Sequence, residues 1–301
     1  MLGFVRMKYN RSTYLIDHVR EHFMQYKIVA DSSSNIRTFD GVDFAGVPLK
    51  IITKEKEYVD TPDLDLEQMV AELKAYKGTS GTSCPNVYEW LEAFGDADCV
   101  FAIAITSNLS GSCNAARQAA EDYMAANPGR KVCVLDSLSA GPELRLIAEK
   151  VREGVLAGKR FEEIEADTRA YMAHTHLLFT LRSLENLARN GRVNPAVAKI
   201  AGVLGIVMVG KASDEGTLQP MHKCRGEKRA LDTLYKEMKD HGYAGGKVRI
   251  GHNLNLPGAK ALEQIIRAEY PDADIQIELS AGLCLFYAEV GGLMVGYEDA
   301  K

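Results

Sequence analysis

The chain has 301 residues, of which 46% are hydrophobic and 26% charged, and its formal net charge is −5 from 36 Lys and Arg against 41 Asp and Glu. This composition is typical of a soluble globular protein with one large or two ordinary domains. The charges are spread along the chain without a basic stripe, so nucleic acid is not expected as a partner. No apolar run has the length that a membrane-spanning helix needs.

Residues 1–23 differ from the rest because they mix basic, polar and aromatic side chains. They contain neither a long apolar core nor a small-residue cleavage site, so a signal peptide is not expected. We interpret them as an N-terminal extension and place the start of the body at Met24. The cysteines form no C-x-x-C pair, which indicates a reducing cytoplasm with no disulfide framework and no zinc; they are Cys84, Cys99, Cys113, Cys133, Cys224 and Cys284.

Apolar runs alternate with helical patterns between residues 24 and 170. Strands are predicted at 26–30, 47–52, 99–105 and 131–135, and helices at 63–75, 87–94, from 113 to the breaker at Asn127, and at 142–157. Such alternation predicts an α/β domain with a parallel sheet that is covered by helices on both faces.

Loops rich in hydroxyl groups follow three of these strands. They are Asp31-Ser32-Ser33-Ser34, Thr106-Ser107-Asn108-Leu109-Ser110 and Asp136-Ser137-Leu138-Ser139. In parallel sheets ligands bind beyond the carboxyl ends of the strands, and a helix N-terminus, here near Ser110-Gly111-Ser112, attracts phosphates and carboxylates. Alternatively, these are ordinary polar loops, and Ser110 or Ser112 simply caps the helix.

The pattern changes after residue 170. Strands are predicted at 175–181, 206–209, 218–221, 248–253, 275–279, 283–287 and 291–297, and helices at 184–189, 195–204, 226–241 and 257–269. Asp214-Glu215-Gly216 is a hairpin signal between two of the strands. Residues 171–301 are therefore predicted to form a second, α+β domain with an antiparallel or mixed sheet.

Three segments come close to phosphate-binding, catalytic or metal-binding motifs. Residues 205–212 are one residue away from a phosphate-binding loop, but their central residues favour a strand. Asn108 stands where a serine-hydrolase elbow has its first glycine; a serine acyl hydrolase or transferase that uses Ser110, with His252 as a base, is the enzymatic alternative. His174 and His176 have no nearby carboxylate or cysteine pattern, so no metal is expected.

An ordered set of short motifs resembles the DegV family of bacterial lipid-binding proteins, over nearly the whole chain from Met24. The motifs are Ala30-Asp31-Ser32, Thr82-Ser83-Cys84-Pro85, Thr106-Ser107-Asn108-Leu109-Ser110-Gly111-Ser112, Asp136-Ser137, Gly191-Arg192-Val193 and Lys223-Cys224-Arg225-Gly226.

The resemblance implies a two-domain fold that encloses one long-chain fatty acid, with the carboxylate between the domains and the tail in an apolar tunnel. Thr82 and Ser110 would hydrogen-bond the carboxylate, with the amides of Gly111 and Ser112 nearby. The residues expected around this group are Asp31, Ser32, Ser83, Ser137 and Arg192. The resemblance also implies a cytoplasmic carrier without cofactor, metal or catalytic residue, which presents its ligand to a separate, ATP-using fatty acid kinase.

One segment departs from the family pattern. The family often has a T-H-x-G-P-G segment near the C-terminus, whose histidine helps to hold the carboxylate, and here Ala288 stands at the histidine position. The head-group environment is therefore expected to differ in this chain. Glu289 would repel a carboxylate unless one of the two is protonated or Glu289 faces away.

Overall fold

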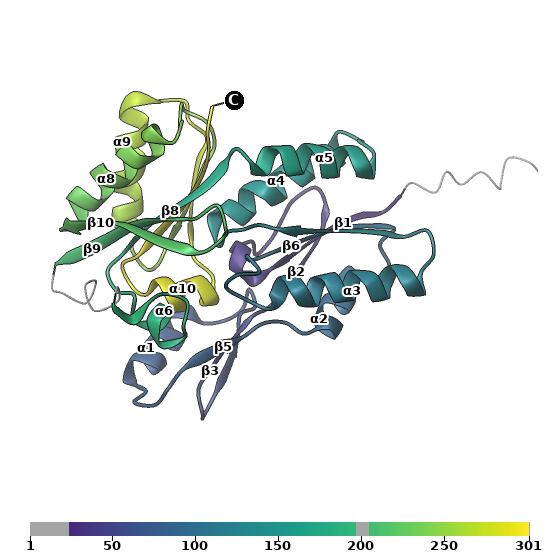
Figure 1. Ribbon diagram of the computed structural model, residues 1–301, viewed down its shortest axis with the longest axis horizontal. Helices are drawn as coiled ribbons and strands as arrows, with labels where there is room; N and C mark the ends of the chain where they lie inside the picture. Colours follow the sequence, from purple (N-terminus) through teal and green to yellow (C-terminus); the bar gives the residue numbers. More distant parts are fainter. Residues whose placement is uncertain (1–23, 197–204, 301) are drawn as a thin grey trace, which may run out of the picture.

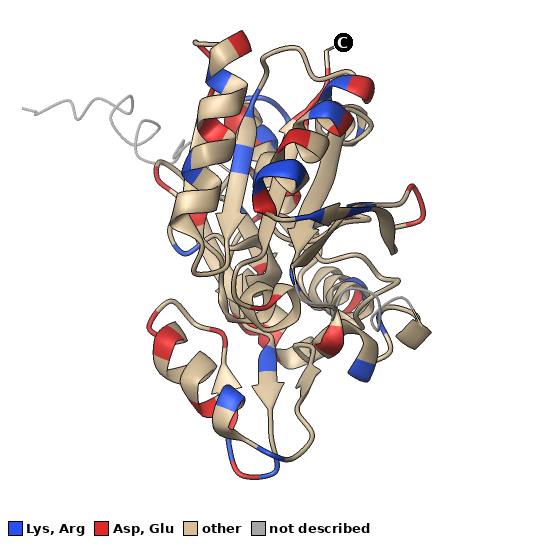
Figure 2. Ribbon diagram, turned by 90° about the vertical axis from the view of Figure 1, so that its left-hand side faces the viewer, with Lys and Arg blue, Asp and Glu red and all other residues tan. Residues whose placement is uncertain are grey.

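The computed structural model describes residues 24–196 and 205–300. Figure 1 shows two sheets side by side, with helices between and around them and a smaller unit of strands and one helix below. In the side view of Figure 2, acidic and basic residues alternate along the helices and turns, while the strands between them carry few charges.

The first sheet is entirely parallel and has the strand order β2-β1-β6-β7. Its strands are β1 (Tyr26–Asp31), β2 (Asp43–Val47), β6 (Cys99–Ala104) and β7 (Lys131–Asp136). One face is covered by α2 (Val87–Phe94) and α3 (Ser112–Ala126), and the other by α4 (Pro142–Leu156) and α5 (Phe161–Met172). The prediction of a parallel sheet covered on both faces is confirmed.

The sequence of β6 explains this double cover. All six of its residues are buried. Val100 and Ala102 pack against α2 and α3, whereas Phe101 and Ile103 pack against α4 and α5. A strand with both faces in a core needs apolar residues at every position, because successive side chains point to opposite faces.

The second sheet is mixed and has the order β10-β9-β8-β13-β11-β12, in which only the β11–β12 pair is parallel. Its strands are β8 (Thr175–Leu181), β9 (Ile206–Ala212), β10 (Leu218–Arg225), β11 (Val248–His252), β12 (Ile275–Leu279) and β13 (Leu293–Glu298). Helices α8 (Glu227–Asp240) and α9 (Leu256–Glu269) cover its outer face. The α+β prediction for the second half is therefore confirmed.

Helix α4 packs on both sheets, because its contacts include β1 and β6 of the first sheet and β8, β11 and β13 of the second. Gly296 in β13 allows this close approach. A Cβ atom on Gly296 would lie 2.7 Å from the backbone nitrogen of Glu143, in the first turn of α4. Backbone of the first half thus rests directly on a strand of the second half.

The single strand predicted at 47–52 is wrong, since these residues belong to two different sheets. Val47 ends β2, whereas β3 (Lys50–Ile52) pairs with β4 (Glu57–Val59) and β5 (Gly81–Ser83) in a small antiparallel sheet. Pro48 lies at the break and has no N–H to donate to a strand ladder. Next to this small sheet, α1 (Leu66–Ala75) starts at the N-cap Asp65, whose side chain accepts the Gln68 N–H.

The strand predicted at 283–287 is also wrong, because these residues form the helix α10 (Gly282–Ala288). Six of its seven residues are buried, and a short, fully apolar run fits a helix or a strand equally well. Its N-terminus is held by Asp60, whose carboxylate accepts the N–H groups of the first two helical residues at 2.6 and 2.9 Å. Asn35 Oδ1 accepts the preceding Ala281 N–H at 2.8 Å.

The remaining segments are brief. A 3-10 turn, η1 (Ser32–Ser34), follows β1, and the short helix α6 (Glu185–Arg189) follows β8 as predicted. None of the patterns above predicts α5, and the helix predicted at 195–204 lies mostly outside the described residues. Within 24–196 and 205–300, every helix is too short or too polar to cross a membrane.

Glu143 provides a stability test at the contact between the two halves. It is 6% exposed, and its Oε1 accepts the Thr175 hydroxyl at 2.9 Å. Burial raises the pKa of Glu143 to about 7, against about 4.3 for an unfolded chain. At pH values between these two pKa values, Glu143 keeps its proton in the folded state but has lost it in the unfolded state. The free energy of unfolding therefore falls as the pH rises through this range.

Glu143→Gln is therefore expected to stabilise the protein at pH 8 by roughly 1–4 kcal/mol and to change little at pH 4.5. The amide keeps an oxygen that can accept the Thr175 hydroxyl. Urea unfolding at several pH values measures the difference, and the exposed Glu121→Gln is the matched control. A variant that is destabilised equally at both pH values would contradict the expectation.

Candidate functional site

A cavity lies where the inner face of the second sheet meets α10 and the loops at the carboxyl end of the first sheet. The centres of water-sized spheres can occupy about 70 Å³ of it, and one water molecule needs roughly 10–15 Å³ by this measure. Its walls are mainly apolar and include Leu49, Ile105, Leu109, Leu187, Leu218 and Leu283. Such walls suit a ligand that is largely hydrocarbon.

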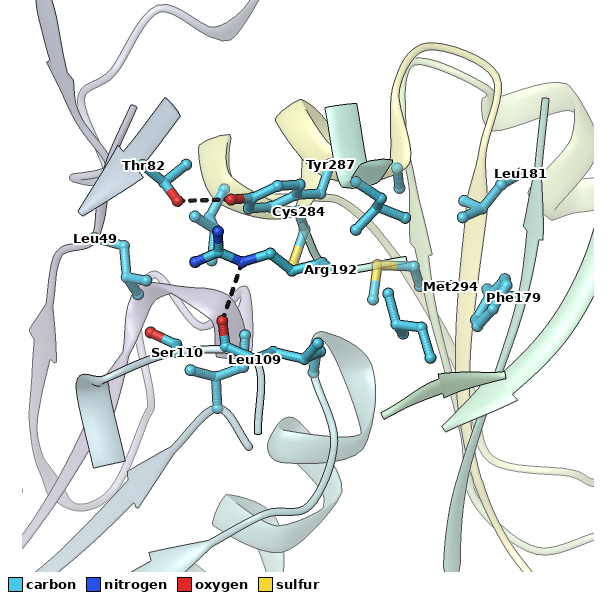
Figure 3. A pocket seen from close by; sticks show the side chains of 16 residues that line it. Leu49, Thr82, Leu109, Ser110, Phe179, Leu181, Arg192, Cys284, Tyr287 and Met294 are labelled. Atoms are coloured by element: carbon cyan, nitrogen blue, oxygen red, sulfur yellow. Dashed lines mark hydrogen bonds between the residues drawn. The ribbon is translucent and has the colours of Figure 1, made fainter. Parts of the chain in front are cut away.

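Polar side chains gather on one side of this cavity (Figure 3). The hydroxyls of Thr82 and Tyr287 are 2.7 Å apart. The Arg192 guanidinium lies 5.9 Å from the centre of the Tyr287 ring, and its Nε donates to the carbonyl of Leu109 at 3.2 Å. Ser110 lines the cavity beside Leu109. Hydroxyl donors and one arginine thus surround a space that suits an anionic head group.

Apolar side chains form the opposite side. Figure 3 shows Phe179 and Leu181 of β8 far from Thr82, with Met294 of β13 between. Phe179 and Leu181 alternate with Leu178, which belongs to the outer core, because successive side chains of a strand point to opposite faces. The cavity therefore has a polar end and an apolar end.

The structure separates the predicted site residues into two groups. Thr82, Ser110 and Arg192 line the cavity. Gly111 is the exposed N-cap of α3. Ser112 is buried, and its hydroxyl donates to Asp31 at 2.7 Å, while its N–H donates to Ser110 Oγ at 3.3 Å. The side chain of Ser112 therefore holds the loop in place instead of facing the cavity.

Asp31 is the centre of this buried network. Its carboxylate accepts the Ser112 hydroxyl, the Ile105 N–H at 2.9 Å, and both the N–H and the hydroxyl of Ser33. Burial raises the pKa of Asp31, and the hydrogen bonds from Ser33, Ser112 and Ile105 oppose that shift. The network joins the ends of β1 and β6 to the start of α3, and so fixes the loop that carries Ser110.

The other predicted hydroxyl residues lie outside the cavity lining. Ser32 Oγ accepts the Leu49 N–H at 3.1 Å. Ser137 Oγ donates to the Ser139 carbonyl at 3.0 Å. Ser83 lies in β5, opposite Lys50 of β3. Ser32 and Ser137 therefore stabilise the loops, and Ser110 is the hydroxyl-bearing residue of these loops that lines the cavity in the described ranges.

The segment that departs from the family pattern forms part of the cavity wall. Ala288 lines the cavity and is buried. Glu289 faces away, because its Oε1 accepts the Ser183 hydroxyl at 2.8 Å and the Asn186 N–H at 3.2 Å. The repulsion considered for Glu289 is thus avoided by its orientation. Tyr287 was missed as a polar contact, because its partner Thr82 is 205 residues away in the sequence.

The other chemical motifs have structural roles. His252 Nδ1 accepts the Asn255 N–H at 3.3 Å, and no histidine lines the cavity within the described ranges. His174 and His176 share the carboxylate of Asp299, at 2.8 and 3.0 Å, a partner that the local sequence did not reveal. In the described part of the chain, no group of three or more potential ligand side chains is arranged to hold a metal ion.

Comparisons with known proteins agree with this architecture. The family model described as an uncharacterised protein of the DegV family matches residues 25–298. A DegV domain-containing protein of Streptococcus pneumoniae (strain R6) is 40% identical over 279 residues, which is 91% of this chain and 99% of the relative.

Two solved structures are similar throughout. A DegV family protein from Eubacterium eligens, loaded with heptadecanoic acid, has a TM-score of 0.90 and 42% identity, and the match covers 91% of this chain and all of that one. The Streptococcus pneumoniae fatty acid kinase (Fak) B3 protein, loaded with linoleic acid, has a TM-score of 0.90 and 40% identity over 92% of this chain and all of that one. The chain described here belongs to the DegV family.

Proposed function

We propose that this protein binds one long-chain fatty acid in the cavity, with the carboxylate near Thr82, Ser110 and Arg192 and the tail toward Phe179 and Met294. The observation that carries the proposal is the cavity itself, which has mainly apolar walls and has hydroxyls and one arginine on one side. The fatty acids bound by the two similar structures, at 42% and 40% identity, support it.

The tail and the carboxylate of the fatty acid contribute different amounts to the free energy of binding. Burial of about 15 methylenes at ~0.8 kcal/mol each contributes roughly 12 kcal/mol of transfer free energy. Hydrogen bonds to a charged group contribute about 1.5–3 kcal/mol. Lost translational freedom and chain ordering offset several kcal/mol. The tail therefore sets the affinity, and the polar end sets the orientation.

We further propose that the protein is a cytoplasmic carrier without a cofactor, which presents its ligand to a separate fatty acid kinase. The similarity to the Streptococcus pneumoniae Fak B3 protein supports this partner. The cavity lining offers Ser110 no histidine as a general base in the described ranges, so we favour carriage over acyl hydrolysis. Incubation of the loaded protein with ATP and a kinase active on another carrier is expected to yield an acyl phosphate.

Native mass spectrometry of the purified full chain tests the binding proposal directly. We expect an added mass of a C14–C18 fatty acid, which denaturing extraction would identify. A protein that is empty and also fails to take up added fatty acid would overturn the proposal. A covalent adduct of Ser110 with a serine-reactive phosphonate would favour the hydrolase alternative instead.

Ser110→Ala is expected to weaken fatty acid binding about 10–150-fold, because one hydrogen bond to a charged group contributes about 1.5–3 kcal/mol. Displacement of a fluorescent fatty acid measures the affinity. Ser107→Ala is the matched control, since Ser107 lies in the same loop but outside the cavity lining. Equal affinities for the wild type and Ser110→Ala, with an unchanged head-group position in a crystal structure, would place the carboxylate elsewhere.

A further inference from the structure

The apolar end of the cavity contains an aromatic ring whose position depends on a glycine in the neighbouring strand. Phe179 of β8 lies opposite Gly210 of β9. A Cβ atom on Gly210 would lie 2.4 Å from Phe179 Cζ and 2.6 Å from Cε2. The ring therefore occupies the space above the glycine and lies along the sheet. A larger residue at 210 would displace the ring, and its Cβ would also lie 2.6 Å from the Gln219 carbonyl oxygen.

From this geometry, and resting on the function proposed above, we propose that Phe179 is a specificity-determining residue that closes the apolar end of the cavity and limits the length of the acyl chain. Phe179 is 2% exposed and lies across the cavity from Thr82 (Figure 3). A fatty acid whose carboxylate is at the polar end has its terminal methyl group directed toward this ring.

Met294 and Phe179 differ in how easily their side chains can move to accommodate a longer acyl chain. Met294 is unbranched and flexible, so it can adjust to tails of different shape. Phe179 is confined on one side by the Gly210 backbone and belongs to the buried cluster that includes Leu177, Leu181 and Met208. A rigid ring in a close-packed wall cannot yield to an extra methylene without displacing its neighbours. Phe179 is therefore the fixed limit, and Met294 the adaptable part.

Changing the size of residue 179 is expected to change the preferred chain length in opposite directions. Phe179→Leu removes ring atoms at the apolar end, so the optimum moves to longer chains, and the affinity ratio of a C20 to a C16 saturated fatty acid rises at least 10-fold. Phe179→Trp places a larger ring at the apolar end, so the optimum moves to shorter chains. Binding of C10 to C20 fatty acids to the delipidated full chain measures both profiles.

The controls separate a specific effect from general loosening. Phe101→Leu removes a buried phenylalanine from the other core, against Phe161, and is expected to leave the length profile unchanged. Phe179→Met keeps a side chain of similar volume and replaces Phe179→Trp if the latter does not fold, as judged by its melting temperature. It is expected to lengthen the tolerated chain, because its flexible side chain yields.

Each outcome decides the proposal. A length profile that is the same in the wild type and in the folded Phe179 variants, while all of them bind fatty acid, would overturn the role of Phe179 and leave the binding function intact. Failure of every protein, including the wild type, to bind a fatty acid of any length would overturn the proposed function and this inference with it.

Discussion

Arg249→Met is expected to lower the free energy of unfolding by about 3–5 kcal/mol, because it leaves a buried carboxylate without its main partner. Arg249 of β11 is 2% exposed, and its Nε and Nη2 donate to the Glu149 carboxylate of α4 at 2.8–3.0 Å. Its Nη2 also donates to Asp274 Oδ2 at 2.8 Å. The arginine thus joins the helix shared by both sheets to the second sheet.

A double variant distinguishes a net contribution of the ion pair from the penalty for breaking it. Arg249→Met combined with Glu149→Leu replaces the charges with apolar groups of similar size, and such replacements are often neutral or stabilising. We therefore expect the double variant to recover most of the stability that Arg249→Met loses, as measured by urea unfolding at pH 7. A double variant as unstable as Arg249→Met would show that packing, and not the stranded charge, causes the loss.

Local sequence patterns predicted most of the fold, because the order of apolar and polar residues in a segment reflects which of its side chains are buried. The apolar run of β6 and the capping residues of α2 depend on neighbours within a few positions. In α2, Asn86 Oδ1 accepts the Glu89 N–H and Glu89 Oε2 accepts the Asn86 N–H. By contrast, α10 depends on Asp60, 222 residues away from Gly282. A nearly uniform apolar run has no period, so its helical state follows from this distant partner.

The residues of the candidate site also fall into those that local motifs predicted and those that only the tertiary structure reveals. Thr82, Ser110 and Arg192 were found through short motifs and line the cavity. Tyr287 and Phe179 were not, because a hydroxyl pair and a ring-on-glycine contact arise only when strands and helices from distant segments meet. Ser112 and Asp31 lay in the expected motifs, but their side chains bond to each other. The motif therefore located the loop, whereas packing decided which of its side chains line the cavity.

Shortening the fatty acid from 16 to 10 carbon atoms is expected to weaken its binding by more than a thousandfold. Each of the six methylenes removed contributes about 0.8 kcal/mol, or about 5 kcal/mol together, and each 1.4 kcal/mol is a factor of ten. The apolar side chains that line the cavity would supply this energy. Isothermal titration of the delipidated protein with each acid measures the ratio.

Replacing the carboxylate head group provides the control for shortening the tail. Hexadecanol keeps the tail but loses the carboxylate, and is expected to bind only about 10–100-fold more weakly than hexadecanoic acid, which corresponds to the 1.5–3 kcal/mol of a charge-assisted hydrogen bond. A tenfold or smaller loss for the C10 acid, together with complete loss for hexadecanol, would contradict the assignment of affinity to the tail. It would instead make Arg192 and its hydroxyl neighbours the main source of binding energy.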